Sequence, residues 1–171
     1  MKKVAVFGKP GSGKSTLSKA LASASGIPLH PLDAIVFKPN GERVARPDYD
    51  AAHMQILNSE RWIIDGFGPI DSFYQRLEHA DTLIYIDLPY PLSYWLVTKR
   101  FAKGLFVTPE GWPEGSSIVK GSIESYKTLR LCPKFWNADF SARLEQLSAG
   151  KSLHIINSLA KLNHFVTDNV G

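Results

Sequence analysis

The stretch GKPGSGKS at residues 8–15 decides the fold. It matches the phosphate-loop pattern G-x-x-x-x-G-K-[ST] at every fixed position. The apolar run Val4–Phe7 precedes it, which is typical of a strand buried on both faces of a parallel sheet. After it, apolar residues recur at helical spacing from Leu17 to Ala24, and Gly26 marks the end of that helix. A chance match in such a chain is roughly a 1% event, so this order of elements predicts a site for nucleotide phosphates.

Each part of this phosphate loop (P-loop, residues 8–15) has an expected role. Its glycines let backbone N–H groups turn toward a phosphate, and the following helix N-terminus adds positive potential. The Lys14 side chain can reach the β and γ oxygens of ATP, and the Ser15 hydroxyl can hold Mg²⁺. Thr16 can serve the helix N-terminus or contact the α-phosphate. The residues expected to bind ATP are therefore Gly8, Pro10, Gly11, Ser12, Gly13, Lys14, Ser15 and Thr16.

Further along the chain, short apolar runs alternate with amphipathic stretches. The sequence predicts strands at about 27–29, 62–65, 82–87 and 153–156, and helices at about 49–57, 72–78, 91–103, 116–131, 139–147 and 159–169. Clustered glycine and proline predict loops at 39–48 and 104–115. Strands that alternate with helices predict an α/β fold with a five-stranded parallel sheet.

Composition narrows the classes of function. The chain has 171 residues, enough for one domain, and a formal net charge of +4. Seven basic and three acidic side chains lie between residues 94 and 134, so this segment carries the whole excess. Positive charge confined to one segment favours the binding of a nucleotide's phosphates over the binding of DNA, which uses extended basic faces. DNA stays open as a second partner. With a lone cysteine, Cys132, and no long apolar run, the chain is expected to be cytoplasmic, without a membrane.

Two later segments carry a family resemblance. The segment WIIDGFGP at residues 62–69 resembles the adenylate kinase segment in which a hydrophobic run precedes D-G-F-P, and Asp87-Leu88-Pro89 resembles the D-x-P after the next strand. The chain thus resembles the nucleoside monophosphate kinase superfamily over nearly its whole length. It is most similar to the adenylate-kinase-like group named DNA topology modulation protein FlaR, through Leu32-Asp33, the W-I-I-D-G segment and Arg76.

This resemblance implies a three-layer α/β/α fold of the P-loop NTPase type with a helical lid. It implies a single domain over residues 1–171, with an acceptor-binding insertion at about 30–61 and a lid segment at about 104–138. Trp112 and Trp136 in the lid segment could clamp a base or sugar, or pack the lid onto the core. The oligomeric state stays open between a monomer and a homodimer.

Three acidic residues end or follow predicted strands at the edge where parallel sheets bind ligands. Asp65 is expected to hold Mg²⁺ through water, together with Ser15; the alternative is a carboxylate that caps a loop. Asp33 could orient or deprotonate an acceptor hydroxyl; the alternative is an N-cap or a surface acid. Asp87 also ends a strand, and Pro89 close by favours a turn role for it.

The chain also departs from the adenylate kinase pattern. Pro69–Asp71 stands where an arginine would hold the monophosphate, so Arg76 would have to substitute. On the helix after Asp87, Leu96 replaces the first of two arginines that the resemblance predicts, and Arg100 matches the second, which implies contact with ATP and with the transferring phosphoryl group. Asn157 lies where relatives hold adenine. The expected catalytic residues are Lys14, Arg100, Asp33 and Arg76.

The predicted function is an ATP-dependent phosphotransferase that uses Mg²⁺. It would move the γ-phosphoryl group to a nucleoside monophosphate or a similar small acceptor, and the acceptor segment of about 30 residues favours one smaller than AMP or not a nucleotide. Two alternatives are a nucleotide-dependent, DNA-associated regulator, as the FlaR name suggests, and a non-catalytic nucleotide-binding module.

Overall fold

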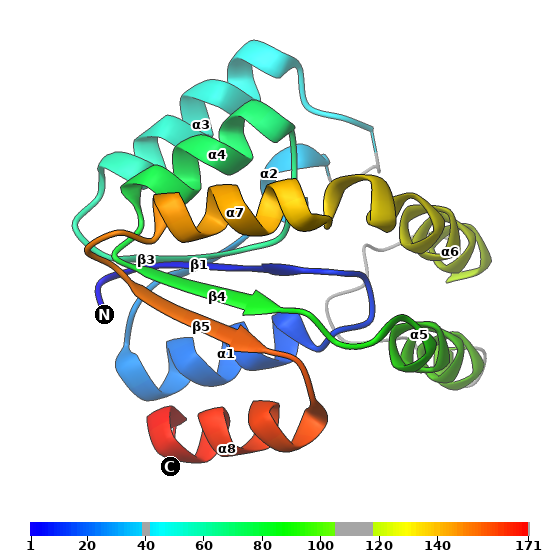
Figure 1. Cartoon of the computed structure of the whole chain (residues 1–171). Coiled ribbons are helices and arrows are strands. Elements are labelled where there is room, and N and C mark those ends of the chain that lie inside the picture. Colours follow the sequence, from blue (N-terminus) through cyan, green and yellow to red (C-terminus); the bar gives the residue numbers. More distant parts are fainter. Residues whose placement is uncertain (39–41, 105–117, 171) are drawn as a thin grey trace.

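A five-stranded parallel sheet forms the centre of the computed structural model, which describes residues 1–38, 42–104 and 118–170. The strand order is β2-β3-β1-β4-β5 (Figure 1). Because β1 and β3 are neighbouring parallel strands, the loops that follow them lie side by side at the same edge of the sheet. The strands are β1 (Lys3–Gly8), β2 (Leu29–Pro31), β3 (Trp62–Asp65), β4 (Thr82–Ile86) and β5 (Ser152–Ile156).

Helices cover both faces of this sheet, which confirms the predicted three-layer α/β/α fold. On one face α1 (Lys14–Ser25) packs against α8 (Leu159–Val170) (Figure 1). On the other face lie α3 (Arg46–Asn58), α4 (Ile70–His79) and α7 (Ala138–Leu147), and the short α2 (Asp33–Val36) precedes α3. The pair α5 (Tyr90–Gly104) and α6 (Ile118–Phe135) stands beyond the carboxyl ends of the strands.

Two separate cores result from the alternation of side chains along the strands. In β1, Val4 and Val6 face α1 and α8, whereas Ala5 and Phe7 face the opposite helices. The aliphatic core, on the α1 and α8 side, consists of Val4, Val6, Leu17, Leu21, Ile27, Ile63, Ile84, Ile86, Leu88, Ile156 and Phe165. The aromatic core, on the other side, contains Phe7, Tyr49, Trp62, Phe73, Tyr85 and Phe140 among smaller apolar residues.

The structure differs from the sequence prediction at the acceptor segment. α3 begins at Arg46 rather than 49, because Pro47 lies in its first turn, where a missing N–H costs no helical hydrogen bond. β2 reaches Pro31 because it is an edge strand, which tolerates a proline. The helix α2 was not predicted, since four residues are too few to show a helical period.

Part of the predicted loops lies outside the described residues. This applies to 39–41 in the acceptor segment and to 105–117, which includes Trp112 and the first part of the predicted lid. Among the helices of the described ranges, none has the length and apolar character needed to cross a membrane.

Candidate nucleotide-binding site

The P-loop passes close to β4 and α5, and glycines make this possible. A Cβ atom on Gly8, whose φ is +144°, would lie 2.2 Å from the carbonyl oxygen of Ile86. On Gly11, with φ +75°, it would lie 2.8 Å from Cγ2 of Val97. These positions therefore require glycine both for the backbone angle and for the space.

The N-terminus of α1 is open to a ligand. Gly13 is the N-cap, with φ +85°, and no side chain of the described residues caps the helix there. The N–H groups of the first helical turn are therefore available to an anion. Ser12 is only 1% exposed, and its hydroxyl has no hydrogen-bond partner among the described residues. The loop thus offers the donors that a phosphate needs.

Lys14 begins α1 and lies at the centre of the predicted site. Its Nζ donates a hydrogen bond of 2.7 Å to the carbonyl oxygen of Lys9. Burial lowers the pKa of Lys14, and the charges of Asp65 and Asp33 oppose that shift, whereas Arg100 adds to it. These four side chains are therefore close enough to influence one another.

Asp65 ends β3 beside the P-loop. It is 6% exposed, and its Oδ1 atom has no hydrogen-bond partner among the described residues. Burial raises the pKa of Asp65, and the Lys14 charge and a hydrogen bond with Ser15 oppose this shift. The structure thus brings Ser15 and Asp65 together as predicted.

This pair fits Mg²⁺. Mg²⁺ prefers oxygen ligands and commonly takes only one or two from the protein, the others being water and substrate phosphates. Within the described ranges, no group of three or more histidine, cysteine, aspartate or glutamate side chains is arranged to hold a metal ion. Mg²⁺ held by Ser15 and Asp65 would take its remaining ligands from water and from the phosphates of a nucleotide.

Asp33 and Arg100 approach the same place from two other elements. Asp33 is an exposed residue in the first turn of α2, and Leu32 rather than Asp33 is the N-cap, so the cap alternative is wrong. Burial lowers the pKa of Arg100, and the Asp33 charge opposes this. The Arg100 guanidinium also donates a 2.8 Å hydrogen bond from Nη2 to the Ser125 hydroxyl, which links α5 to α6.

Arg76 does not lie in an open crevice, contrary to the expectation from its sequence position. It is 0% exposed, and its Nη2 donates hydrogen bonds of 2.9 Å to the carbonyl oxygens of Gly66 and Phe67. Burial lowers the pKa of Arg76 to about 10. The guanidinium stabilises the loop after β3 and lies 5.5 Å from the centre of the Phe73 ring, while its Nε and Nη1 atoms have no hydrogen-bond partner among the described residues.

The sequence did not reveal an ion pair between the P-loop and the end of β4. The Lys9 side chain, with the residue 2% exposed, pairs with the Asp87 carboxylate, and its Nζ lies 4.6 Å from the centre of the Tyr90 ring. Asp87 therefore holds the P-loop rather than only a turn. The available signal was a lysine at a variable position of the motif and an acid after β4, which alone indicate no pairing.

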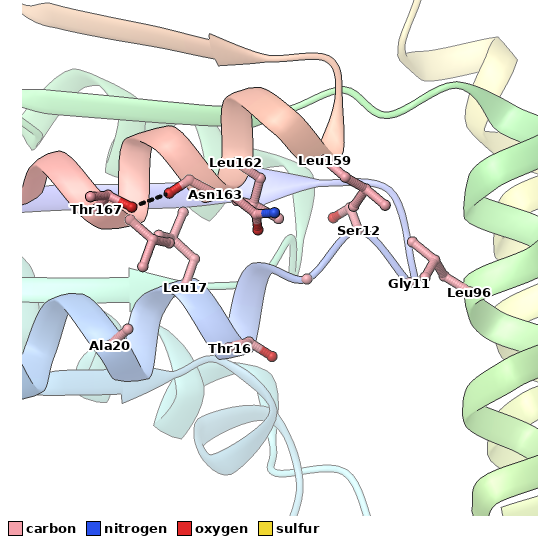
Figure 2. Close-up of a pocket in the computed structure, with 12 residues that line it drawn as sticks. Gly11, Ser12, Thr16, Leu17, Ala20, Leu96, Leu159, Leu162, Asn163 and Thr167 are labelled. Carbon is pink, nitrogen blue, oxygen red and sulfur yellow. Dashed lines mark hydrogen bonds between the residues drawn. The ribbon is translucent and has the colours of Figure 1, made fainter. Parts of the chain in front are cut away.

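A pocket of about 560 Å³ lies between the P-loop, α1 and α8 (Figure 2). Asn157, the residue expected near adenine, is not part of its lining, whereas α8 contributes five residues that sequence reasoning did not select. Leu96, at the position of the missing arginine, does line it. The lining consists of Gly11, Ser12, Gly13, Thr16, Leu17, Ala20, Leu96, Leu159, Leu162, Asn163, Val166 and Thr167.

Trp136 packs in the aromatic cluster instead of facing a ligand. Its ring stacks on Tyr85 at a centroid distance of 5.2 Å and meets Phe140 edge-on at 4.7 Å. Of the two alternatives for this residue, the core role is the one that the contacts support.

Comparisons with known proteins identify the fold. No protein-family model matches the chain, and no curated protein matches it. The shikimate kinase from Acinetobacter baumannii in complex with shikimate superimposes with a TM-score of 0.55 at 15% identity, over 98% of this chain and 90% of that one. The chain has the fold of shikimate kinases. A shikimate kinase from Bacteroides thetaiotaomicron gives a TM-score of 0.53 at 15% identity, over 96% of this chain and 94% of that one.

Proposed function

We propose that the protein is an ATP-dependent kinase that transfers the γ-phosphoryl group to a small hydroxylated acceptor. The observation that carries this proposal is the placement of Lys14, Asp65 and Asp33 after the adjacent parallel strands β1, β3 and β2, beside an open P-loop and with Arg100 on α5. The likeness of fold to shikimate kinases supports an acceptor of this class.

Each of these residues has a role in the transfer. Lys14 and the backbone N–H groups of the P-loop would bind the β- and γ-phosphates. Ser15 and Asp65 would hold Mg²⁺, which when bound neutralises phosphate charge. Asp33 would accept the proton of the acceptor hydroxyl, whose oxygen bonds to the γ-phosphorus while the bond to the β–γ bridging oxygen breaks and ADP leaves. Arg100 would stabilise charge on the transferring group.

The placement of Arg76 favours a hydroxylated acceptor over a nucleoside monophosphate. A monophosphate needs an accessible cation, and the arginine expected to supply it is fully buried and hydrogen-bonded to two carbonyl oxygens. Residues at about 30–61, which carry Asp33, would bind the acceptor, and a lid at about 104–138 would close over it. Closure would exclude water from the transfer.

A coupled assay of ADP release tests this function. The purified chain with ATP and Mg²⁺ is offered hydroxy acids, polyols, nucleosides and nucleoside monophosphates in turn. We expect one hydroxylated class to stimulate ADP release, and Lys14→Ala to lower that rate at least about 100-fold, because the lysine binds the transferring phosphate. Lys161→Ala, which removes an exposed lysine of α8, is the matched control and should keep full activity.

Two different results would contradict the kinase proposal, and each favours another function. If ATP binds but no acceptor stimulates turnover, the chain is a non-catalytic nucleotide-binding module. If the chain instead binds DNA in a salt-sensitive way that Lys14→Ala does not change, the regulator suggested by the FlaR name is the better description.

A further inference from the structure

The pocket between the P-loop and α8 differs in character from the phosphate site. None of its twelve lining residues is ionisable, and most of them are apolar or glycine. Leu162 brings α8 up to the P-loop, since a Cβ atom on Gly13 would lie 3.3 Å from Leu162 Cδ2. A neutral, largely apolar pocket that adjoins a phosphate site suits the uncharged end of a nucleotide, which is its base.

Four lining residues carry polar side chains: Ser12, Thr16, Asn163 and Thr167. Ser12 and Thr16 belong to the phosphate end of the pocket, and the Thr167 hydroxyl already donates to the carbonyl oxygen of Asn163, at 3.1 Å. The Asn163 carboxamide makes no hydrogen bond with any described residue. It lies on the side of α8 that faces the P-loop and the start of α1 (Figure 2).

We propose that Asn163 reads the base of the donor nucleotide and makes the site selective for adenine over guanine. The inference rests on the proposed function, because it requires a nucleoside triphosphate on the P-loop. It assigns the specificity to α8 rather than to the position of Asn157.

The chemistry of a carboxamide explains the selectivity. A carboxamide presents one acceptor and a donor side by side, and adenine offers the complementary N6–H donor beside the N7 acceptor. Guanine presents two acceptors, O6 and N7, at the same edge, so only one of the two hydrogen bonds can form. Leu96, Leu159 and Leu162 would contact the base faces, but an apolar contact cannot distinguish the two purines.

Calorimetric binding of ATP, GTP and tripolyphosphate separates base recognition from phosphate recognition. The unmodified chain is compared with Asn163→Leu, with Asn163→Asp and with Asn169→Leu, a control on the same helix that lies outside the pocket lining. Circular dichroism of each variant shows whether it is folded.

We expect the unmodified chain to bind ATP about tenfold more tightly than GTP. Asn163→Leu should weaken ATP about tenfold, bring the two nucleotides to similar affinity and leave tripolyphosphate unchanged. Asn163→Asp should weaken GTP more than ATP, because a carboxylate only accepts hydrogen bonds and meets two acceptors at this edge of guanine, whereas adenine still offers its N6–H donor. The control should behave as the unmodified chain does.

The inference is overturned if Asn163→Leu keeps the ATP preference, or if it weakens all three ligands equally. An unmodified chain that binds tripolyphosphate but does not distinguish ATP from GTP also overturns it, while leaving the proposed function intact. A chain that binds none of the three contradicts the proposed function, and the inference with it.

Discussion

The aliphatic core and the aromatic core lie on opposite faces of one sheet, yet they differ in the buried titratable and polar groups that they contain. Buried titratable and polar groups gather on the aromatic side, where Arg76 is 0% and His53 1% exposed. Aromatic rings surround them: the Arg76 guanidinium lies 5.5 Å from the centre of the Phe73 ring, and Tyr49 stacks on His53 at 5.7 Å. Ring faces attract cations, so an aromatic core can enclose a charge that an aliphatic one cannot.

The two faces of the sheet border different parts of the proposed site. The neutral pocket adjoins the aliphatic core and would receive the base of the donor. Asp65 ends β3, and β3 is followed by the loop that the buried Arg76 holds from the aromatic side. The transfer chemistry therefore borders the face that already contains buried charge.

The largest expected effect compares one residue from each core. Phe73→Ala should lower the free energy of unfolding by about 4 kcal/mol, and Leu21→Ala by about 3 kcal/mol, because the ring leaves the larger cavity. Both residues are nearly inaccessible, at 0% and 1% exposure, so burial does not bias the comparison. Urea denaturation measures both values. If Leu21→Ala costs more than Phe73→Ala, the size of the cavity does not decide the difference between the two cores.

A second prediction concerns pH. Burial and the Arg76 charge lower the pKa of His53 from 6.5 to about 4. The folded state thus keeps a neutral imidazole where the unfolded chain binds a proton, so stability is full above pH 6.5 and falls as the pH drops toward 4. The loss from this one group should approach about 3 kcal/mol.

Denaturation of the unmodified chain and of His53→Gln at pH 7.5 and at pH 4.5 checks this, since the variant should lose less stability on acidification. The matched control is His164→Gln, which removes an exposed histidine of α8 on the other face. A His53→Gln profile as steep as that of the unmodified chain would refute the assignment.

The third prediction concerns Arg100, at the proposed site of phosphoryl transfer, where the two faces of the sheet meet. Arg100→Ala should lower kcat about 100-fold and change ATP affinity less than about threefold, because the charge it stabilises develops during transfer. Steady-state kinetics and direct ATP binding give the two numbers. Lys99→Ala removes the neighbouring cation and should alter neither. An equal loss in ATP affinity would place Arg100 in ground-state binding instead.

The smallest effect compares an asparagine at the start of one helix with an asparagine at the end of another. Asn137 caps α7 on the aromatic side, where its Oδ1 accepts a 2.9 Å hydrogen bond from the backbone N–H of Phe140. Asn137→Ala should therefore cost about 1 kcal/mol of unfolding free energy. Asn58→Ala, at the end of α3, should change it by less than about 0.5 kcal/mol. Thermal unfolding of the two variants falsifies the capping role if their losses are equal.

The sequence predicted the sheet and the P-loop because both depend on local patterns. Buried runs such as Trp62–Asp65 and the spacing of Gly8 to Ser15 indicate their structure without reference to distant residues. The same logic placed Asp65 beside Ser15, since parallel strands end at one edge.

Other features depended on tertiary packing and could not be predicted. Arg76 has the spacing of a ligand-binding residue, but only the rotation of α4 determines that it points into a core. The contribution of α8 to the pocket likewise follows from its packing against α1, not from the polarity of Asn163. The pairing of Lys9 with Asp87 joins residues 78 positions apart.

The hydrogen bond from Lys14 to the Lys9 carbonyl has an entropic consequence for ligand binding. A lysine side chain loses up to about 2 kcal/mol of rotamer freedom when it is fixed. Because Lys14 is already fixed on a carbonyl of its own loop, most of that loss accompanies folding rather than ligand binding. An arriving phosphate need only exchange one acceptor for a charged one, so the ammonium group is preorganised for capture before any ligand is present.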